Sequence, residues 1–427
     1  MSTTHNSNNG KQQLFDLDTS AYIYTATRLK KWNQVYRFST ILKQDVQPEI
    51  LSQAIADLRG RFPNFYTQLK AGFFQYKLRT VQDVDILERE HEYPCRPIRV
   101  GSGEKPMFRV LYFKNRISVE VFHLVADGGG CIVYTKTLLA RYFELLGFQI
   151  EKTHGVLDIN ENPKESETQD SFRKMFSTKE ERLPRAEDAA YQYRPELKEN
   201  YMRVISGLMS VDELKLLTKA KGVTITQYFA AVYIYAFYQN MLPNKSEKPI
   251  KISIPSDLRR LFGSETLRNF SLFANVGIHP KSRDYTFDEI LSEIAPKIKE
   301  GLNKEALSPI ASANVSDSNL LAFRMAPLLL KRLILWIGAT LYGPRVITSA
   351  QSNLGILTVP AGMEDKVDHF EMMIGETGKN YINSAAITYN DILDITFTSK
   401  SEATDIQRYF FTFLTAQGIK VSIQSNV

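Results

Sequence analysis

The chain has 427 residues, of which 43% are hydrophobic and 23% are charged. These values are typical of globular proteins and exclude a disordered chain, a collagen-like chain and a small disulfide scaffold. With 53 Lys and Arg against 47 Asp and Glu, the formal net charge is +6. The excess cations are spread along the chain, so the charge gives no indication of nucleic-acid binding.

The N-terminus and the cysteines indicate the compartment. Residues Met1 to Gln13 are polar and lack an apolar core, so they do not form a signal peptide. Cys95 and Cys131 have no CxxC spacing and no neighbouring His pair, which leaves a zinc site unsupported and excludes a disulfide framework. We therefore expect buried free thiols, a cytoplasmic location and no bound metal.

The first 150 residues mix strands with helices. Strands are expected at Val35 to Leu42, Phe73 to Leu78, Met107 to Phe113 and Ile117 to Phe122, where β-branched and aromatic residues gather. Helical periodicity predicts a helix over Glu49 to Leu58 and a longer one from about Gly129 to Leu146. This region, residues 1–150, is expected to be the N-terminal half of the molecule.

Residues 151–200 are rich in charge and poor in apolar clusters. A stretch of this length without regular structure is unusual inside one compact domain, so we expect a solvated crossover here, with room for short helices. The second half is then residues 201–427.

The second half has the same mixture of elements. A capping box at Ser210 to Glu213 opens one helix, and Thr224 to Tyr238 is apolar enough to be a buried helix. The other expected elements are strands at Ile250 to Ile254, Ser271 to Ile278, Ile356 to Val359, Val367 to Met373 and Ile392 to Phe397, and a helix from about Ala403 to Leu414. The interleaving predicts an α/β fold with mixed sheets.

The segment from Ala326 to Leu341 is strongly apolar, but Pro327 and the pair Lys331 and Arg332 interrupt it. Its uninterrupted part is shorter than the ~20 residues that a membrane span needs. We expect a buried or half-buried helix, with a role at a membrane surface as the less favoured alternative.

The sequence lacks a phosphate-binding P-loop, a GxGxxG fingerprint, a GxSxG elbow and an HExxH pair. One constellation remains, VEVFHLVADGGG over Val119 to Gly130. His123 stands where a strand ends, Asp127 follows four residues later, and three glycines precede an apolar helix. The imidazole, with a pKa near 6.5, suits a general base, whereas Asp127 suits a helix cap. From the spacing alone, a structural histidine beside a capping Asp is the favoured interpretation.

The segment HLVADGG resembles the HxxxDG motif of the chloramphenicol-acetyltransferase-like superfamily of CoA-dependent acyltransferases. Other segments are similar to that superfamily in the same order, and together they span most of the chain. They are Leu58 to Leu69, Lys221 to Phe237, Ile252 to Gly263 with the following RNFSLFANV, Ser352 to Pro360, and Ile382 to Lys400. The SNLG segment is closest to the alcohol acetyltransferase and condensation-domain-like branch.

The resemblance implies two pseudo-symmetric mixed α/β sandwich domains with an active-site tunnel at their interface. It implies that His123 is the general base and that Asp127, followed by Gly128, is mainly structural and pairs with Arg259 from the second half. A donor for the oxyanion is also required. Ser352, Asn353 and Asn269 are the candidates, and each has an alternative role in capping a strand end or a turn. Asp257 is expected to be structural.

This chain departs from the family pattern in two places. Arg268, rather than Gly, precedes Asn269, and Phe122 precedes His123 where condensation domains have a second His. The expected function is acyl transfer from an acyl-CoA co-substrate to a small-molecule alcohol or amine. Two alternatives stay open: a condensation-like or polyketide-associated enzyme that takes its acyl group from an acyl carrier protein, and a non-catalytic ligand-binding protein that kept the fold.

Overall fold

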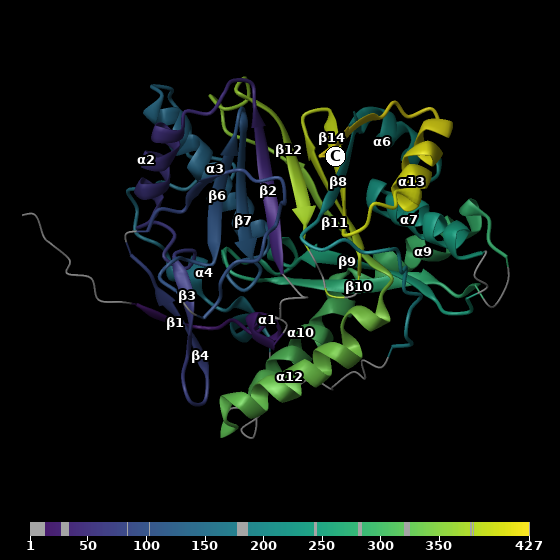
Figure 1. Ribbon diagram of the computed structural model, residues 1–427, viewed down its shortest axis with the longest axis horizontal. Helices are drawn as coiled ribbons and strands as arrows, with labels where there is room; N and C mark the ends of the chain where they lie inside the picture. The colour runs from purple at the N-terminus through teal and green to yellow at the C-terminus, as the bar shows by residue number, and fades with distance from the viewer. Residues whose placement is uncertain are drawn as a thin grey trace, which may run out of the picture.

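The computed structural model describes residues 13–26, 34–82, 84–101, 103–176, 187–242, 246–280, 284–319, 325–375, 378 and 380–426. Most of the N-terminal stretch considered above lies outside these residues. Within them the chain has the mixed α/β architecture expected from the sequence, with its strands in three sheets. Figure 1 shows the two larger sheets side by side, with helices on the outer flank of each.

The N-terminal half is built on a five-stranded sheet in the order β12-β2-β7-β6-β5. Helices α2 and α3 flank it, and a small sheet of order β1-β4-β3 lies beyond its lower end (Figure 1). The elements of this half are β1 (Leu14–Asp16), α1 (Ala21–Ala26), β2 (Val35–Leu42), α2 (Pro48–Leu58), β3 (Thr67–Ala71), β4 (Tyr76–Thr80), β5 (Leu87–Arg89), β6 (Phe108–Phe113), β7 (Arg116–Phe122) and α3 (Gly128–Leu145).

The C-terminal half is built on a seven-stranded sheet in the order β10-β9-β11-β13-β14-β8-β15. The elements from the crossover onward are α4 (Glu165–Thr168), α5 (Ser171–Met175), β8 (Arg203–Ser210), α6 (Val211–Ala220), α7 (Ile225–Met241), β9 (Ile250–Asp257), α8 (Arg259–Phe262), β10 (Ser271–Ile278), α9 (Phe287–Gly301), α10 (Lys304–Asn319), α12 (Leu328–Tyr342), a 3-10 turn (Pro344–Val346), β11 (Ser349–Leu357), β12 (Val367–Ile374), β13 (Ile382–Tyr389), β14 (Ile392–Ser399), α13 (Asp405–Ala416) and β15 (Ser422–Ser425).

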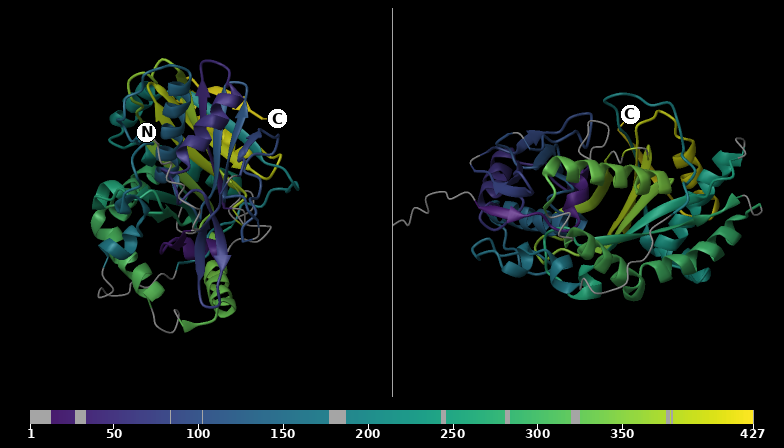
Figure 2. Two further views of the ribbon diagram at one scale, coloured as in Figure 1. Left: turned by 90° about the vertical axis from the view of Figure 1, so that its left-hand side faces the viewer. Right: turned by 90° about the horizontal axis from the view of Figure 1, so that it is seen from below.

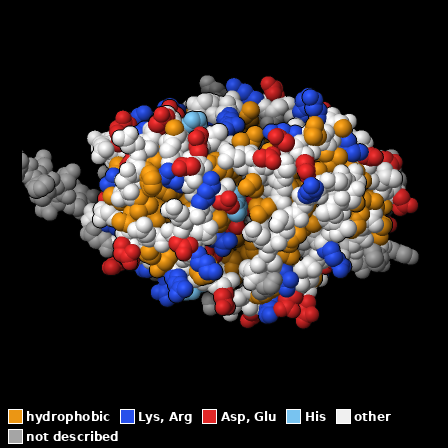
Figure 3. All heavy atoms as spheres, turned by 90° about the horizontal axis from the view of Figure 1, so that it is seen from above, with side chains coloured by type: hydrophobic (Ala, Val, Ile, Leu, Met, Phe, Trp, Pro, Cys, Tyr) orange, Lys and Arg blue, Asp and Glu red, His pale blue; other side chains and the backbone are white. Residues whose placement is uncertain are grey.

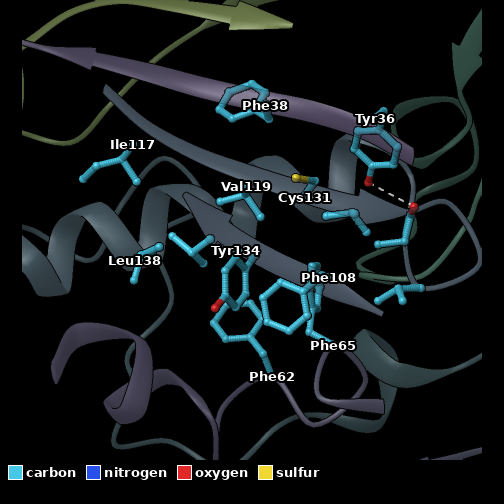
Figure 4. Packing of buried hydrophobic residues seen from close by; sticks show 14 of the residues in the cluster. Tyr36, Phe38, Phe62, Phe65, Phe108, Ile117, Val119, Cys131, Tyr134 and Leu138 are labelled. Carbon is cyan, nitrogen blue, oxygen red and sulfur yellow. Dashed lines mark hydrogen bonds between the residues drawn. The ribbon is translucent and has the colours of Figure 1, made fainter. Parts of the chain in front are cut away.

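Aromatic packing between helix α3 and the first sheet forms much of the N-terminal core. Tyr134 of α3 stacks on Phe65, with ring centroids 4.7 Å apart, and meets Phe62 and Phe108 edge to face. Figure 4 shows these rings gathered beneath β7. A second cluster surrounds the buried helix α7 in the C-terminal half. Both free cysteines, Cys95 and Cys131, are buried, as expected.

Strand β12 belongs to the C-terminal half by sequence but pairs antiparallel with β2, from Val367 opposite Leu42 to Ile374 opposite Tyr36. The expected division into residues 1–150, 151–200 and 201–427 stays a prediction. The pairing shows that a strand of the third region completes the sheet of the first.

Most of the expected elements are confirmed, and two strands need correction. The segment Phe73 to Leu78 is not one strand, because Gly72 N–H donates to Gln75 O at 3.0 Å and closes a turn between β3 and β4. Its aromatic residues suit a strand, but they lie at the tip of a hairpin. The strand expected at Ile356 to Val359 begins seven residues earlier and ends at Leu357.

The apolar segment from Ala326 to Leu341 forms helix α12, which is half-buried, the second of the two expected arrangements; the side that it exposes, however, is the apolar one. Several of its large apolar side chains are exposed. Among the residues that the structure describes, no helix combines the length and apolarity needed to cross a membrane.

Candidate active site

The first sheet positions His123. Strand β7 pairs with β2 up to Phe122 opposite Val35, and His123 N–H then donates to Gln34 O at 2.8 Å. The imidazole is therefore fixed at the end of a central strand, with its backbone still tied to the neighbouring strand. A short turn leads from His123 to Asp127, where helix α3 begins.

The Nδ1 atom of His123 lies 3.0 Å from Asn269 Oδ1. The amide nitrogen of Asn269 points elsewhere, to Asp18 Oδ2 at 3.3 Å and Leu124 O at 3.5 Å. Because both contacts of that nitrogen are acceptors, the oxygen is the atom turned toward the imidazole. His123 Nδ1 then carries the proton, and Nε2 holds the lone pair.

Two tyrosines surround the imidazole. The ring of Tyr24, from α1, stacks on it with centroids 4.6 Å apart, and Tyr36 approaches it edge-on at 5.2 Å. The hydroxyl of Tyr36 donates to Ala126 O and Asp127 O at 3.0 and 2.9 Å, which ties β2 to the turn before α3 (Figure 4). Burial raises the pKa of the Tyr24 phenol above its usual range, so that group is protonated.

Burial also acts on the imidazole. Desolvation lowers the pKa of His123 below 6.5, partly opposed by the charge of Asp127 and by the hydrogen bond with Asn269. At neutral pH the ring is therefore uncharged and able to accept a proton.

Asp127 does not contact the imidazole in this arrangement. It caps helix α3 by accepting from Gly130 N–H at 3.2 Å, and its other oxygen accepts from Phe270 N–H at 2.7 Å. The guanidinium of Arg259 completes a two-point ion pair, with distances of 2.7 and 3.1 Å. The charge of Arg259 and these hydrogen bonds hold the pKa of Asp127 below its usual value despite burial.

Arg259 extends this link into the second half. Besides Asp127, it donates to Thr266 O at 2.7 Å, to Arg268 O at 2.5 Å and to Asp257 Oδ1 at 2.8 Å. The pairing of Asp127 with Arg259 that the resemblance implies is therefore present. One guanidinium holds the cap of α3 and the loop that carries Asn269.

Gly129 and Gly130 are required by close contacts rather than by unusual dihedral angles. A Cβ at Gly130 would lie 2.1 Å from Leu267 O, and one at Gly129 would lie 2.7 Å from a guanidinium nitrogen of Arg259. A Cβ at Gly128 would meet only the Leu354 side chain, at 3.0 Å. Helix α3 thus begins in direct contact with the backbone of the second half.

Sequence reasoning missed Asp18. This fully buried carboxylate accepts from Ala21 N–H at 2.7 Å, receives the amide of Asn269, and lies 3.5 Å from Arg268 Nε. Desolvation raises its pKa to about 6. No motif marks it, because Asp18 and Asn269 are 251 residues apart. Arg268, noted from the sequence as a departure at the Gly position, is its charge partner.

The other two oxyanion candidates lie in β11. Asn353 Nδ2 donates to Thr226 Oγ1 at 2.9 Å, at the start of α7, and its Oδ1 accepts from Gly355 N–H. Neighbouring residues of a regular strand face opposite ways, so Ser352 faces away from Asn353. The pairing of β11 with β13 shifts after Asn353, and Leu354, which lies beside Gly128, belongs to that irregular part. Of the three candidates, the structure brings Asn269 to the imidazole, turns Asn353 toward α7, and leaves Ser352 on the other face of β11.

A hollow of about 460 Å³ opens elsewhere, between β8, β12 and β14, and is lined by residues that include His369, Asp391 and Lys420. His369 pairs with Ile41, whereas Tyr36, beside His123, lies at the other end of β2. The hollow is therefore separate from the His123 site. No group of three or more potential metal ligands occurs among the described residues.

No protein-family model matches the chain, and no curated protein matches its sequence. Solved structures do match its fold. The trichothecene 15-O-acetyltransferase of Fusarium sporotrichioides is 11% identical, with 96% of each chain covered and a TM-score of 0.59. TRI101 of F. graminearum, solved with coenzyme A and T-2 mycotoxin, is 11% identical, with 98% of this chain and all of that one covered and a TM-score of 0.63.

The chain has the chloramphenicol-acetyltransferase-like fold. The epimerization domain of a tyrocidine synthetase shares it too, at 12% identity, with 97% of this chain and 98% of that one covered and a TM-score of 0.56. At sequence identities this low, the structural match establishes the fold alone, and the same fold serves more than one reaction. The function must therefore be argued from the site.

Proposed function

We propose that this chain transfers an acyl group from an acyl-CoA thioester to an alcohol or amine, with His123 as the general base. The observation that carries the proposal is the contact of His123 Nδ1 with Asn269 Oδ1. It fixes the tautomer that a base requires, and burial keeps the ring neutral.

In the proposed reaction, Nε2 of His123 takes the proton of the acceptor as its oxygen or nitrogen attacks the thioester carbonyl. The tetrahedral intermediate then collapses, the carbon–sulfur bond breaks, and the proton passes from His123 to the departing thiolate of CoA. No acyl group is attached to the protein. Asp127 and Arg259 act by holding the start of α3 against the loop of Asn269.

We assign the oxyanion donor to Ser352. The amide nitrogen of Asn269 is engaged by Asp18, and Asn353 faces α7, so neither is free to stabilise charge near His123. Ser352 lies on the face of β11 opposite Asn353, and its hydroxyl is the right kind of donor. The expected tunnel at the interface of the two halves remains part of the proposal.

The test is release of free thiol from acetyl-, butyryl- and longer acyl-CoAs, each with a panel of alcohols and amines. We expect acceptor-dependent release of CoA. His123→Ala should lower kcat by about 10²–10⁴ with little change in Tm, and Ser352→Ala by about 10²–10³. Full activity in His123→Ala would refute the proposed base.

Two other outcomes would favour the alternatives. Absence of release from every CoA donor, but release when the acyl group is carried on an acyl carrier protein, would indicate a condensation-like or polyketide-associated enzyme. Binding of an acyl-CoA without turnover, in both the wild type and His123→Ala, would indicate a ligand-binding protein.

A further inference from the structure

Helix α12 exposes its apolar side. Among residues 328–338 of the helix, whose exposure the structure describes, the six exposed side chains are all large and hydrophobic, and Leu329, at 78%, is the most exposed of them. The six are Leu329, Leu330, Leu333, Ile334, Trp336 and Ile337. A helix on a globular protein normally turns such residues inward, so the arrangement requires an explanation.

Helical geometry shows that the apolar side of α12 faces solvent and its opposite side faces the protein. At 3.6 residues per turn, the six exposed side chains fall within an arc of about 160°. The opposite arc contains Lys331, which is 4% exposed and donates to Phe74 O at 2.6 Å. The helix thus directs a cation toward the protein and its apolar side away from it.

The exposed apolar surface continues onto the hairpin of β3 and β4. Phe73, 72% exposed, and Phe74 form the tip, and Leu328 N–H donates to Phe73 O at 3.0 Å. Figures 1 and 2 show the hairpin and α12 projecting together from one end of the molecule. We call this surface the apolar ridge; it consists of Phe73, Phe74 and the six exposed residues of α12.

The two segments that carry the ridge contain basic residues and no acidic ones, although Arg61 and Lys331 are buried and Lys77 pairs with Asp16 of β1. Residues 58–82, which include the hairpin, contain five Lys and Arg and no Asp or Glu. Residues 318–363, which include α12, contain four Lys and Arg and again no Asp or Glu. On the opposite face, by contrast, acidic and basic side chains are interspersed (Figure 3).

We propose that the apolar ridge inserts into the interface of an anionic phospholipid membrane. Leucine, phenylalanine and tryptophan side chains on a helix that lies in the membrane plane, accompanied by cations, suit the boundary between acyl chains and anionic headgroups. The ridge projects from the body of the protein, as insertion into a bilayer requires. α12 lies on the membrane and does not span it.

The proposal is tested by sedimentation of the full-length chain with vesicles of phosphatidylcholine, alone or with phosphatidylserine. Leu329→Glu removes an apolar contact from the ridge. Leu216→Glu is the matched control, because Leu216 lies on α6 and is 72% exposed. We expect binding to the anionic vesicles, a loss of about tenfold or more in Leu329→Glu, and a change below about twofold in Leu216→Glu.

A second readout uses tryptophan fluorescence. The chain has two Trp, so Trp32→Phe leaves Trp336 as the only one. Its emission should shift to the blue with anionic vesicles, and brominated lipid should quench it. CoA release with a water-soluble acceptor should be the same in Leu329→Glu as in the wild type, so this test is independent of the proposed chemistry.

Three results would overturn the proposal. The first is absence of sedimentation with either vesicle. The second is an equal effect of Leu329→Glu and Leu216→Glu. The third is a concentration-dependent dimer that Leu329→Glu breaks, without vesicle binding, which would make the ridge a contact between copies of the chain. Equal binding to both vesicle types would refute the selectivity for an anionic surface.

Discussion

Replacing Gly130 with Ala tests whether the contact between α3 and the second half sets the geometry of the site. The new Cβ would lie 2.1 Å from Leu267 O, whereas ordinary contacts begin at 3.4 Å. The backbones must therefore separate by 3.4 − 2.1 = 1.3 Å. Leu267 stands two residues before Asn269, so the movement would draw that amide away from His123.

The expected loss of stability in Gly130→Ala can be compared with that of a control variant, Gly128→Ala, in the same motif. Overpacking a site of this kind costs about 1–3 kcal/mol, and a helical Gly→Ala change otherwise contributes about 1 kcal/mol of stability. At Gly128 the new methyl meets only the movable end of Leu354, so Gly128→Ala should keep the wild-type Tm or exceed it. Gly130→Ala should have a lower Tm than the wild type.

Activity should separate the two variants further. A displacement of about 1 Å in a catalytic group can cost about 10²-fold in rate. CoA release by Gly130→Ala should fall by that order, while Gly128→Ala should retain most of its rate. The two variants would be assayed side by side for thiol release and thermal unfolding. Wild-type Tm and activity in Gly130→Ala would refute the claim that this contact positions Asn269.

Three further variants test the electrostatics. Asp127→Ala leaves the guanidinium of Arg259 with Asp257 as its one carboxylate partner and removes the acceptor of the Gly130 and Phe270 N–H groups. It should destabilise the fold by about 3–5 kcal/mol in denaturant unfolding, together with loss of activity; unchanged stability would contradict the role of the ion pair. Burial lowers the pKa of His123, so the plateau of kcat/KM should extend below pH 6.5. In the wild type the hydrogen bond with Asn269 raises that pKa, so Asn269→Ala should lower it and move the acid limb of the profile to lower pH. Asp394 is buried near Glu371 and His369, and desolvation raises its pKa to about 8. The unfolded chain releases this proton near pH 4 and the folded chain only near pH 8, so this carboxyl should lower the stability of the wild type by about 1.4 kcal/mol per pH unit between them. Asp394→Asn should remove this contribution, so the Tm of the variant relative to the wild type should rise from pH 5 to pH 8; a Tm difference that stays constant over that range would contradict this account.

Much of the site was predictable, because its parts follow one another in the sequence or match a family pattern. The strand before His123, the cap at Asp127 and the pairing with Arg259 all belong to this class. The contact of Asp18 with Asn269 does not, since it joins distant residues that no local periodicity links.

Helix α12 illustrates a different limit of prediction from the sequence. Periodicity shows which residues of α12 share a face, but it does not show which way that face points. The prediction of burial assumed that an apolar face is always covered. Lys331 lies on the side of α12 that faces the protein and donates to the carbonyl of Phe74 in the hairpin, a contact between residues 257 positions apart. The hairpin itself was missed because aromatic residues favour strands whether or not they occupy a turn.

The exchange of β12 between the halves has a consequence for biosynthesis. Strand β2 is buried along its whole length, yet its partner β12 ends 252 residues after β7 does, at Ile374 rather than Phe122. At about 5–20 residues per second, a ribosome needs roughly 13–50 s to cover that interval. During this time the nascent chain carries an open apolar strand edge, the kind of surface on which chains aggregate. Chaperone supply during translation should therefore govern the yield of this protein more than its final stability does.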